Sequence, residues 1–158
     1  NQATEVLRLS PDGTWLLYDS DLNGNGDLFI VASDGGTPRQ LTDDPADDLS
    51  ANWSPDGSEI AFHSFRTGNR DIFTMNADGT GLAQVTTDTL GDRYAAWGPD
   101  HTTLACPRGD GRWNSWRSRG IHRRRHGGRP RVWARESRPF SPLTAPPTSC
   151  GGETACLN

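Results

Sequence analysis

Short apolar runs, separated by turn-forming residues, dominate the first two-thirds of the chain. The runs are continuous rather than strictly alternating, as in Ile60-Ala61-Phe62, and this is typical of strands that are covered on both faces of a sheet. Asp-Gly pairs at 34–35 and 78–79 are hairpin signals. The pattern predicts strands near 15–19, 27–32, 38–42, 59–63, 71–76 and 82–86.

One turn element recurs at a fixed interval. Ser10-Pro11-Asp12-Gly13 returns 44 residues later as Ser54-Pro55-Asp56-Gly57, and 44 residues after that as the altered Gly98-Pro99-Asp100-His101. Proline fixes φ at the second turn position, and glycine accepts the positive φ that closes the turn. A further strand is expected to end just before each turn, so each repeat holds four short strands.

Four strands in a repeat of about 40–45 residues are typical of a β-propeller blade. We therefore expect an all-β fold, a partial β-propeller that spans residues 1–105. It would contain two complete four-stranded blades, at about 6–49 and 50–93, and the first half of a third blade at 94–105. Propellers close into rings with ~4–8 blades, so we expect the chain to be a fragment of a longer repeat protein.

The composition changes sharply after residue 105. Residues 1–105 hold 5 Arg and 17 acidic residues, a net charge of −12, whereas residues 106–158 hold 11 Arg and 3 acidic residues, a net charge of +8. The three cysteines, Cys106, Cys150 and Cys156, all lie in the second part. Because such a break marks a boundary, we predict that residues 106–158 form an Arg-rich, irregular or disordered C-terminal tail.

Three explanations of this tail stay open. An error in the reading frame would explain why the repeat stops inside an expected strand, since shifted GC-rich DNA encodes many Arg and Trp residues. A genuine disordered tail is the second explanation. The third, which we favour least, is an arginine-rich arm that binds the phosphates of a nucleic acid, with Trp113, Trp116 and Trp133 stacking on its bases.

The repeat resembles that of the TolB family of β-propellers. The resemblance rests on Trp53-Ser54-Pro55-Asp56-Gly57, on Asp71-Ile72-Phe73, on Asp78-Gly79, and on the closing pairs Leu41-Thr42 and Val85-Thr86. TolB-type proteins are bacterial and many act outside the cytoplasm, so the resemblance implies a periplasmic or extracytoplasmic binding protein. The same repeat is similar to propellers that precede the catalytic domain of prolyl-oligopeptidase-type serine peptidases.

The resemblance implies a non-catalytic scaffold that binds a protein or peptide through its propeller loops. We expect no enzymatic activity, because the sequence contains no G-x-S-x-G elbow and no other catalytic constellation. The alternative is the non-catalytic propeller segment of a prolyl-oligopeptidase-type peptidase whose catalytic domain is absent here. We expect neither a membrane span nor a nucleic-acid partner.

The segment 19–27 is a candidate calcium loop. Oxygen-bearing side chains at alternate positions around a turn-forming Gly24 are what Ca²⁺ needs, and the pattern resembles the calcium loop of integrin-type propeller blades. In the second repeat Asp71 is retained while the other acids are lost, which favours a plain hairpin with a structural acid at the start of the third strand. Calcium is thus the only cofactor that the sequence suggests, and its candidate ligands are Asp19, Asp21, Asn23, Asn25 and Asp27.

Other polar and aromatic residues have structural interpretations. Ser54 belongs to a turn and His63 to a strand, so we expect a structural histidine whose hydrogen bonds are satisfied. Trp53 and Trp97 occupy one position of the repeat, which favours packing between blades over ligand stacking. Between the first two repeats we expect a solvated acidic loop, or alternatively a rim that binds cations or a basic partner; its acids are Asp43, Asp44, Asp47 and Asp48.

Overall fold

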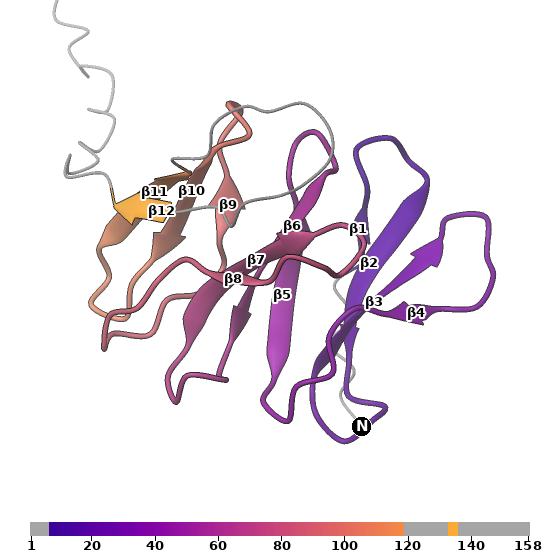
Figure 1. The fold of residues 1–158 in the computed structure, drawn as a ribbon, viewed down its shortest axis with the longest axis horizontal. Helices are drawn as coiled ribbons and strands as arrows, with labels where there is room; N and C mark the ends of the chain where they lie inside the picture. Colours follow the sequence, from indigo (N-terminus) through magenta and orange to yellow (C-terminus); the bar gives the residue numbers. More distant parts are fainter. Residues whose placement is uncertain (1–6, 119–132, 136–158) are drawn as a thin grey trace, which may run out of the picture.

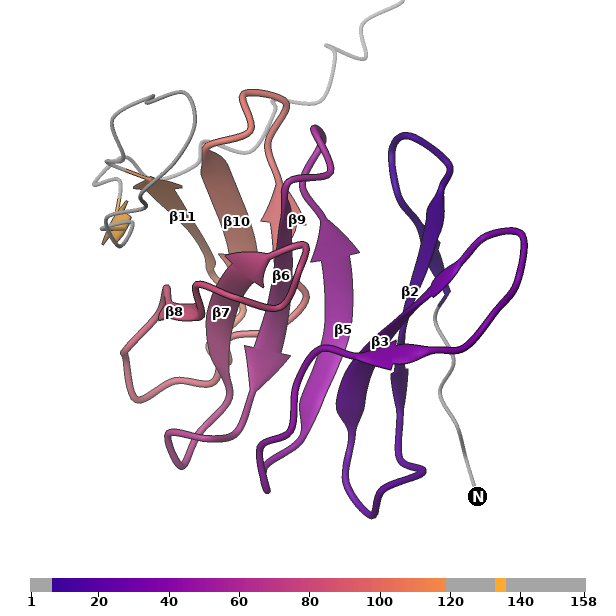
Figure 2. The ribbon, with the colours of Figure 1, turned by 45° about the vertical axis from the view of Figure 1, so that its right-hand side comes forward.

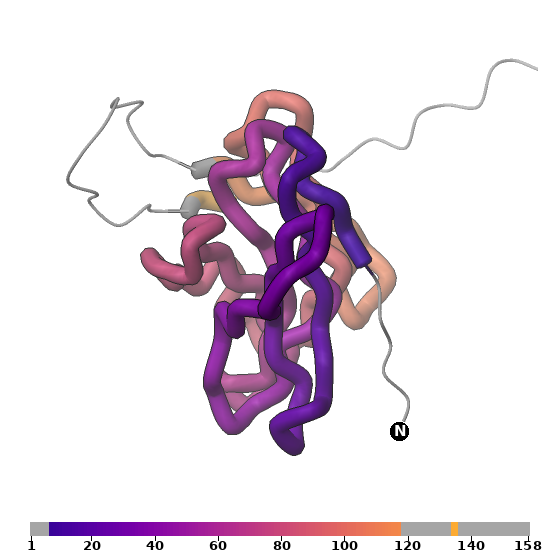
Figure 3. The backbone as a smooth tube through the Cα atoms, turned by 90° about the vertical axis from the view of Figure 1, so that its right-hand side faces the viewer, coloured from indigo at the N-terminus to yellow at the C-terminus, as the bar shows by residue number. Residues whose placement is uncertain are grey.

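The computed structural model describes residues 7–118 and 133–135, which fold into three four-stranded antiparallel sheets. Within each sheet the strands follow one another in sequence order. The sheets stand side by side in Figures 1 and 2 and one behind another in the view of Figure 3. This is the expected arrangement of propeller blades, and the partial all-β propeller is confirmed.

The strand bounds match the sequence pattern closely in the first two blades. Blade 1 consists of β1 (Arg8–Leu9), β2 (Trp15–Ser20), β3 (Asp27–Ala32) and β4 (Arg39–Gln40). Blade 2 consists of β5 (Asp48–Trp53), β6 (Glu59–Ser64), β7 (Asp71–Asn76) and β8 (Ala83–Gln84). Blade 3 consists of β9 (Ala96–Trp97), β10 (Thr103–Pro107), β11 (Trp113–Ser118) and β12 (Trp133–Arg135).

Blade 3 is more complete than the half-blade that the sequence predicts. The expected boundary at residue 105 falls inside β10, which continues to Pro107 and pairs with β11. Strand pairing uses backbone N–H and C=O groups, so a change in composition does not end it. Trp116 lies opposite Leu104 and is buried against blade 2. Most of the predicted tail, including Cys150 and Cys156, lies outside the described residues.

The Ser-Pro-Asp-Gly turns are stabilised by their own side chains. The Asp56 carboxylate accepts hydrogen bonds from the Ser54 hydroxyl at 2.7 Å and from the Ser58 backbone N–H at 3.1 Å. Gly57 has a φ of 72° and donates to the Ser54 carbonyl. In the third copy His101 takes this left-handed position with a φ of 58°. The turn therefore keeps its backbone geometry even where the sequence is altered.

Two apolar layers hold the blades together. The layer between blades 1 and 2 is formed by Leu17, Leu28, Ile30, Ala51, Ile60, Phe62, Phe73 and Met75. The layer between blades 2 and 3 is formed by Ala61, Ile72, Val85, Ala95, Leu104, Cys106 and Trp116. Both faces of blade 2 are therefore covered, which explains the continuous apolar runs of its strands.

The repeated tryptophans join neighbouring blades, as predicted. The indole N–H of Trp53 donates to the backbone carbonyl of Arg8 at 3.0 Å, and that of Trp97 donates to the carbonyl of Asn52 at 3.4 Å. Arg8 and Asn52 are themselves one repeat apart. Each tryptophan thus fixes the first strand of its own blade to the first strand of the blade before it.

Candidate functional site

One end of the sheets collects polar residues, some of which recur in the repeat while others vary. We call this the loop end. It consists of the connections between second and third strands (21–26, 65–70, 108–112) and the connections between blades (41–47, 85–95). The Asn25 side chain binds the Asp44 carbonyl at 2.8 Å, and the Asn69 side chain binds the Asp88 carbonyl at 2.7 Å, so the two kinds of connection are tied together.

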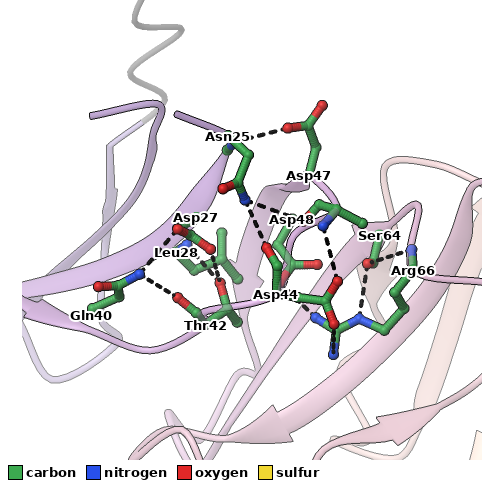
Figure 4. Close-up of polar contacts among 12 residues, drawn as sticks. Asn25, Asp27, Leu28, Gln40, Thr42, Asp44, Asp47, Asp48, Ser64 and Arg66 are labelled. Carbon is green, nitrogen blue, oxygen red and sulfur yellow. Dashed lines mark hydrogen bonds and ion pairs between the residues drawn. The ribbon is translucent and has the colours of Figure 1, made fainter. Parts of the chain in front are cut away.

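A repeated hydrogen-bond network underlies the loop end. In blade 1 the Asp27 carboxylate accepts from Gln40 at 3.0 Å and from the Thr42 hydroxyl at 3.5 Å, while the Thr42 oxygen accepts from the Leu28 N–H at 2.9 Å (Figure 4). In blade 2 the Asp71 carboxylate accepts the corresponding bonds from Gln84 and the Thr86 hydroxyl, and the Thr86 oxygen accepts from the Ile72 N–H. The acid that starts each third strand is therefore structural in these two blades, as predicted.

The candidate calcium ligands have different surroundings. Asp19 is buried and accepts from the Ser50 N–H at 3.4 Å, Asp21 is exposed, and Asn23 donates to Gln40. In the described part of the chain, no three His, Cys, Asp or Glu side chains are placed to hold one metal ion. Calcium binding at this loop stays a hypothesis, which a calcium titration of the melting temperature tests.

The acidic connection between blades 1 and 2 is only partly solvated. Asp43 and Asp47 are exposed, as expected, but Asp48 is fully buried. Its carboxylate forms a 2.6 Å ion pair with the guanidinium of Arg66, which also lies 3.8 Å from the Asp44 carboxylate (Figure 4). The prediction of a solvated loop is therefore wrong for Asp48, because the start of β5 turns its side chain toward the neighbouring loop.

The corresponding acid of the next blade lacks such a close cation. Asp92 is fully buried, and neither of its carboxylate oxygens accepts a hydrogen bond within the described residues. Burial, with the nearby Asp88 carboxylate, raises the pKa of Asp92 to about 6. Burial also raises the pKa of the Cys106 thiol, with the Asp92 carboxylate as the next cause. Asp92 is thus held in its protonated form at mildly acidic pH.

Replacing Asp92 by asparagine is expected to stabilise the chain at neutral pH. The folded state binds the Asp92 proton more tightly than the unfolded state, so this group costs stability as the pH rises from about 4 to 6. The difference between its pKa and the ordinary 3.8 corresponds to about 3 kcal/mol. Urea unfolding should therefore show a gain approaching that size at pH 7.5 and little gain at pH 4, whereas Asp34→Asn, in an exposed turn, should change neither.

The junction of blades 2 and 3 carries an aromatic and cationic cluster at the loop end. We call it the His63 cluster; it contains His63, Phe65, Arg70, Arg93 and Tyr94. The His63 ring lies 6.3 Å from that of Phe65 and 6.1 Å from that of Tyr94, both edge to face. The Arg70 guanidinium lies over Phe65, 4.8 Å from the ring centroid. Sequence reasoning missed this cluster because its members come from strand β6 and from two separate connections, 65–70 and 85–95.

His63 is buried, as a structural histidine should be, but not all of its hydrogen bonds are made. The prediction that its hydrogen bonds are satisfied is therefore wrong. Its side chain is only 4% exposed, and its Nδ1 makes no hydrogen bond within the described residues. Burial, followed by repulsion from Arg70 and Arg93, lowers the pKa of His63 to about 4, while Asp47 acts in the opposite direction. The ring is therefore neutral at pH 7 and has an unused polar atom.

Comparison with known proteins identifies the repeat. A model of the TolB beta propeller domain matches residues 3–132, which extends beyond the composition break at residue 105. Among curated proteins no match is found. In the described residues there is no helix with the length and apolar character of a membrane span.

Solved structures show the same fold. A putative TolB from Agrobacterium tumefaciens is 24% identical with a TM-score of 0.62, over 68% of this chain and 43% of that protein. TolB from Acinetobacter baumannii is 20% identical with a TM-score of 0.63, over 75% of this chain and 31% of that protein. A puromycin hydrolase is 20% identical with a TM-score of 0.57, over 70% of this chain and 19% of that enzyme. The chain thus spans less than half of each, and by its repeats it belongs to the TolB beta propeller domain family.

Proposed function

We propose that this chain is part of a TolB-like, non-catalytic propeller that binds a protein or peptide partner through its loop end. The observation that carries the proposal is the contrast between repeated and variable positions. The framework residues recur 44 residues apart with the same hydrogen bonds, as in Asp27 and Asp71. Other residues that the framework presents at the loop end do not recur, as in the exposed Asp21 and the half-buried Phe65.

This contrast supports a role in partner binding, because framework residues and partner-contacting residues are under different structural constraints. Residues that hold the blade must make the same bonds in every repeat, whereas residues that contact a partner need only match that partner. The likeness to TolB from two bacteria supports a bacterial protein that binds its partner in the periplasm. The partner class in this proposal is a protein or peptide.

Peptide selection tests the proposal with a matched pair of variants. A random peptide library is selected on the full chain, and the enriched peptides are then measured against Tyr94→Asn and His101→Gly. Both positions have positive φ, 53° and 58°, which Asn and Gly tolerate, so neither substitution strains the backbone. We expect Tyr94→Asn, at the loop end, to weaken binding. We expect His101→Gly, in the turn between β9 and β10 at the other end of the sheet, to leave binding unchanged. The reverse pattern would contradict the proposal.

A second candidate function is the propeller segment of a serine peptidase. The likeness to a puromycin hydrolase and to the tricorn protease, with a TM-score of 0.56 for the latter, favours it. Sequencing the coding DNA downstream of this chain distinguishes the two. An α/β-hydrolase segment with a G-x-S-x-G elbow would support the peptidase, and further propeller repeats followed by a stop codon would support the scaffold.

A further inference from the structure

The His63 cluster contains cations without an ion pair and polar atoms without a hydrogen bond in the described part of the chain. Within the described residues, neither Arg70 nor Arg93 forms an ion pair, although acidic residues outnumber Arg in this part of the chain. The Arg70 Nε is buried and makes no hydrogen bond, and the same holds for the Nδ1 of His63. A buried polar group without a partner costs free energy, and the exposed Arg93 and half-buried Arg70 keep charge that an anionic ligand can pair with.

The backbone around the cluster places these groups together. The Asp92 N–H donates to the Arg70 carbonyl at 2.7 Å, which brings the connection between blades 2 and 3 against the loop that holds Phe65. Arg93 and Tyr94 follow directly. Tyr94 has a φ of 53°, an uncommon conformation for an aromatic residue, and it exposes 60% of its surface. The connection therefore presents a ring and a cation to solvent beside the buried imidazole.

The preceding junction shows that the fold does not require this cluster. The same backbone bond joins Asp48 to Gly26 at 2.7 Å, and Ser50 has the same left-handed φ of 55° as Tyr94. The side chains on that framework are nevertheless acidic, small or aliphatic. The residues that correspond to His63, Phe65, Arg70, Arg93 and Tyr94 are Asp19, Asp21, Gly26, Leu49 and Ser50.

We propose that the His63 cluster is a binding site for the carboxylate groups of an acidic peptide segment. Arg93 and Arg70 supply charge-assisted donors for the carboxylate, and the exposed Tyr94 ring supplies a flat apolar surface for the neighbouring residues. The buried His63 imidazole lies directly beneath, in contact with the Tyr94 ring. The inference rests on the proposed function, since it names the partner chemistry of the same loop end.

The test uses the full chain and two peptides that differ only in charge. The probe is acetyl-Ala-Phe-Glu-Glu-Ala-amide, and its control is the peptide with glutamine in place of both glutamates. Binding is followed by NMR, through the arginine side-chain N–H signals and the His63 ring. We expect the glutamate peptide to bind about tenfold more tightly, as one or two charge-assisted hydrogen bonds imply. Its bound carboxylate should also raise the pKa of His63 above its value of about 4 in the free protein.

Charge-matched variants locate the site. Arg93→Gln and Arg70→Gln should each weaken binding of the glutamate peptide several-fold and reduce the shift of the His63 pKa. Arg8→Gln removes the same charge from an exposed position on β1 and should bind like the original chain. Arg93 is exposed, so its variant also tests the site if the half-buried Arg70 variant does not fold.

Three results would overturn the inference: equal affinity for both peptides, binding that survives Arg93→Gln, or no binding at millimolar peptide. A succinate titration separates a peptide ligand from a free dicarboxylate, and tighter binding of succinate would also overturn the assignment to a peptide. If selected peptides without acidic residues bind the loop end through Tyr94, the proposed function stands and only this inference fails. If no peptide binds the loop end, both fail.

Discussion

Replacing Phe62 by alanine is expected to lower the free energy of unfolding by about 3–5 kcal/mol, the usual loss for a buried phenylalanine. Phe62 has no exposed surface and lies in the apolar layer between blades 1 and 2, where its ring stacks on Phe73 at a centroid distance of 6.0 Å. Alanine would leave a cavity in the layer that joins these two blades. Urea unfolding followed by tryptophan fluorescence measures the loss, with Trp53 packed against the same layer.

The repeat provides a matched control for this substitution. Tyr18 occupies the same position one repeat earlier and stacks on Phe29 at 5.7 Å, but it is only half-buried. Because Tyr18→Ala removes less buried surface, we expect a loss less than half as large as that of Phe62→Ala. Equal losses for the two variants would show that packing between blades 1 and 2 does not dominate the stability of the chain.

Replacing Arg66 by methionine is expected to destabilise the chain by about 3–5 kcal/mol, the usual result of removing one partner of a buried ion pair. The substitution keeps an unbranched side chain but leaves the fully buried Asp48 carboxylate without its cation at 2.6 Å. It also removes the guanidinium that lies 5.0 Å from the centroid of the Phe73 ring. Urea unfolding at pH 7 measures the change.

A double-mutant cycle separates charge from packing in this result. Asp48→Asn removes the charge that Arg66→Met leaves unpaired, so the double variant should be more stable than Arg66→Met alone. Arg39→Met serves as the control, because within the described residues the exposed Arg39 donates only to the backbone carbonyls of Asp78 and Ala77. It should cost about 1 kcal/mol or less. If Asp48→Asn gives no recovery, the ion pair does not account for the role of Arg66.

The strands and turns of the first two blades could be predicted from the sequence because they depend on local geometry. β3 and β7 have the predicted bounds, and the two Ser-Pro-Asp-Gly turns close as proline and glycine require. The repeat adds a second copy against which each element can be checked, and for this reason the structural role of Asp27 was visible beside Asp71.

The third blade could not be delimited in the same way. Beyond residue 105 the apolar pattern and the repeat both fade, yet β10 pairs with β11 along its whole length. Backbone pairing depends on the neighbouring strand and on the layer against blade 2. Neither can be recognised in a single stretch of sequence.

The amino-acid sequence therefore fixes the blade as a unit, since strand periodicity and turn chemistry act over a few neighbouring residues. It does not distinguish the exposed Asp47 from the buried Asp48, because the difference depends on Arg66 in another loop. Nor does it bring His63 and Tyr94 together, since they lie 31 positions apart in the chain and packing of blade 3 on blade 2 joins them in space. Burial, ion pairing and the candidate site arise from contacts between blades. Such contacts do not produce a periodic pattern of residues in the sequence.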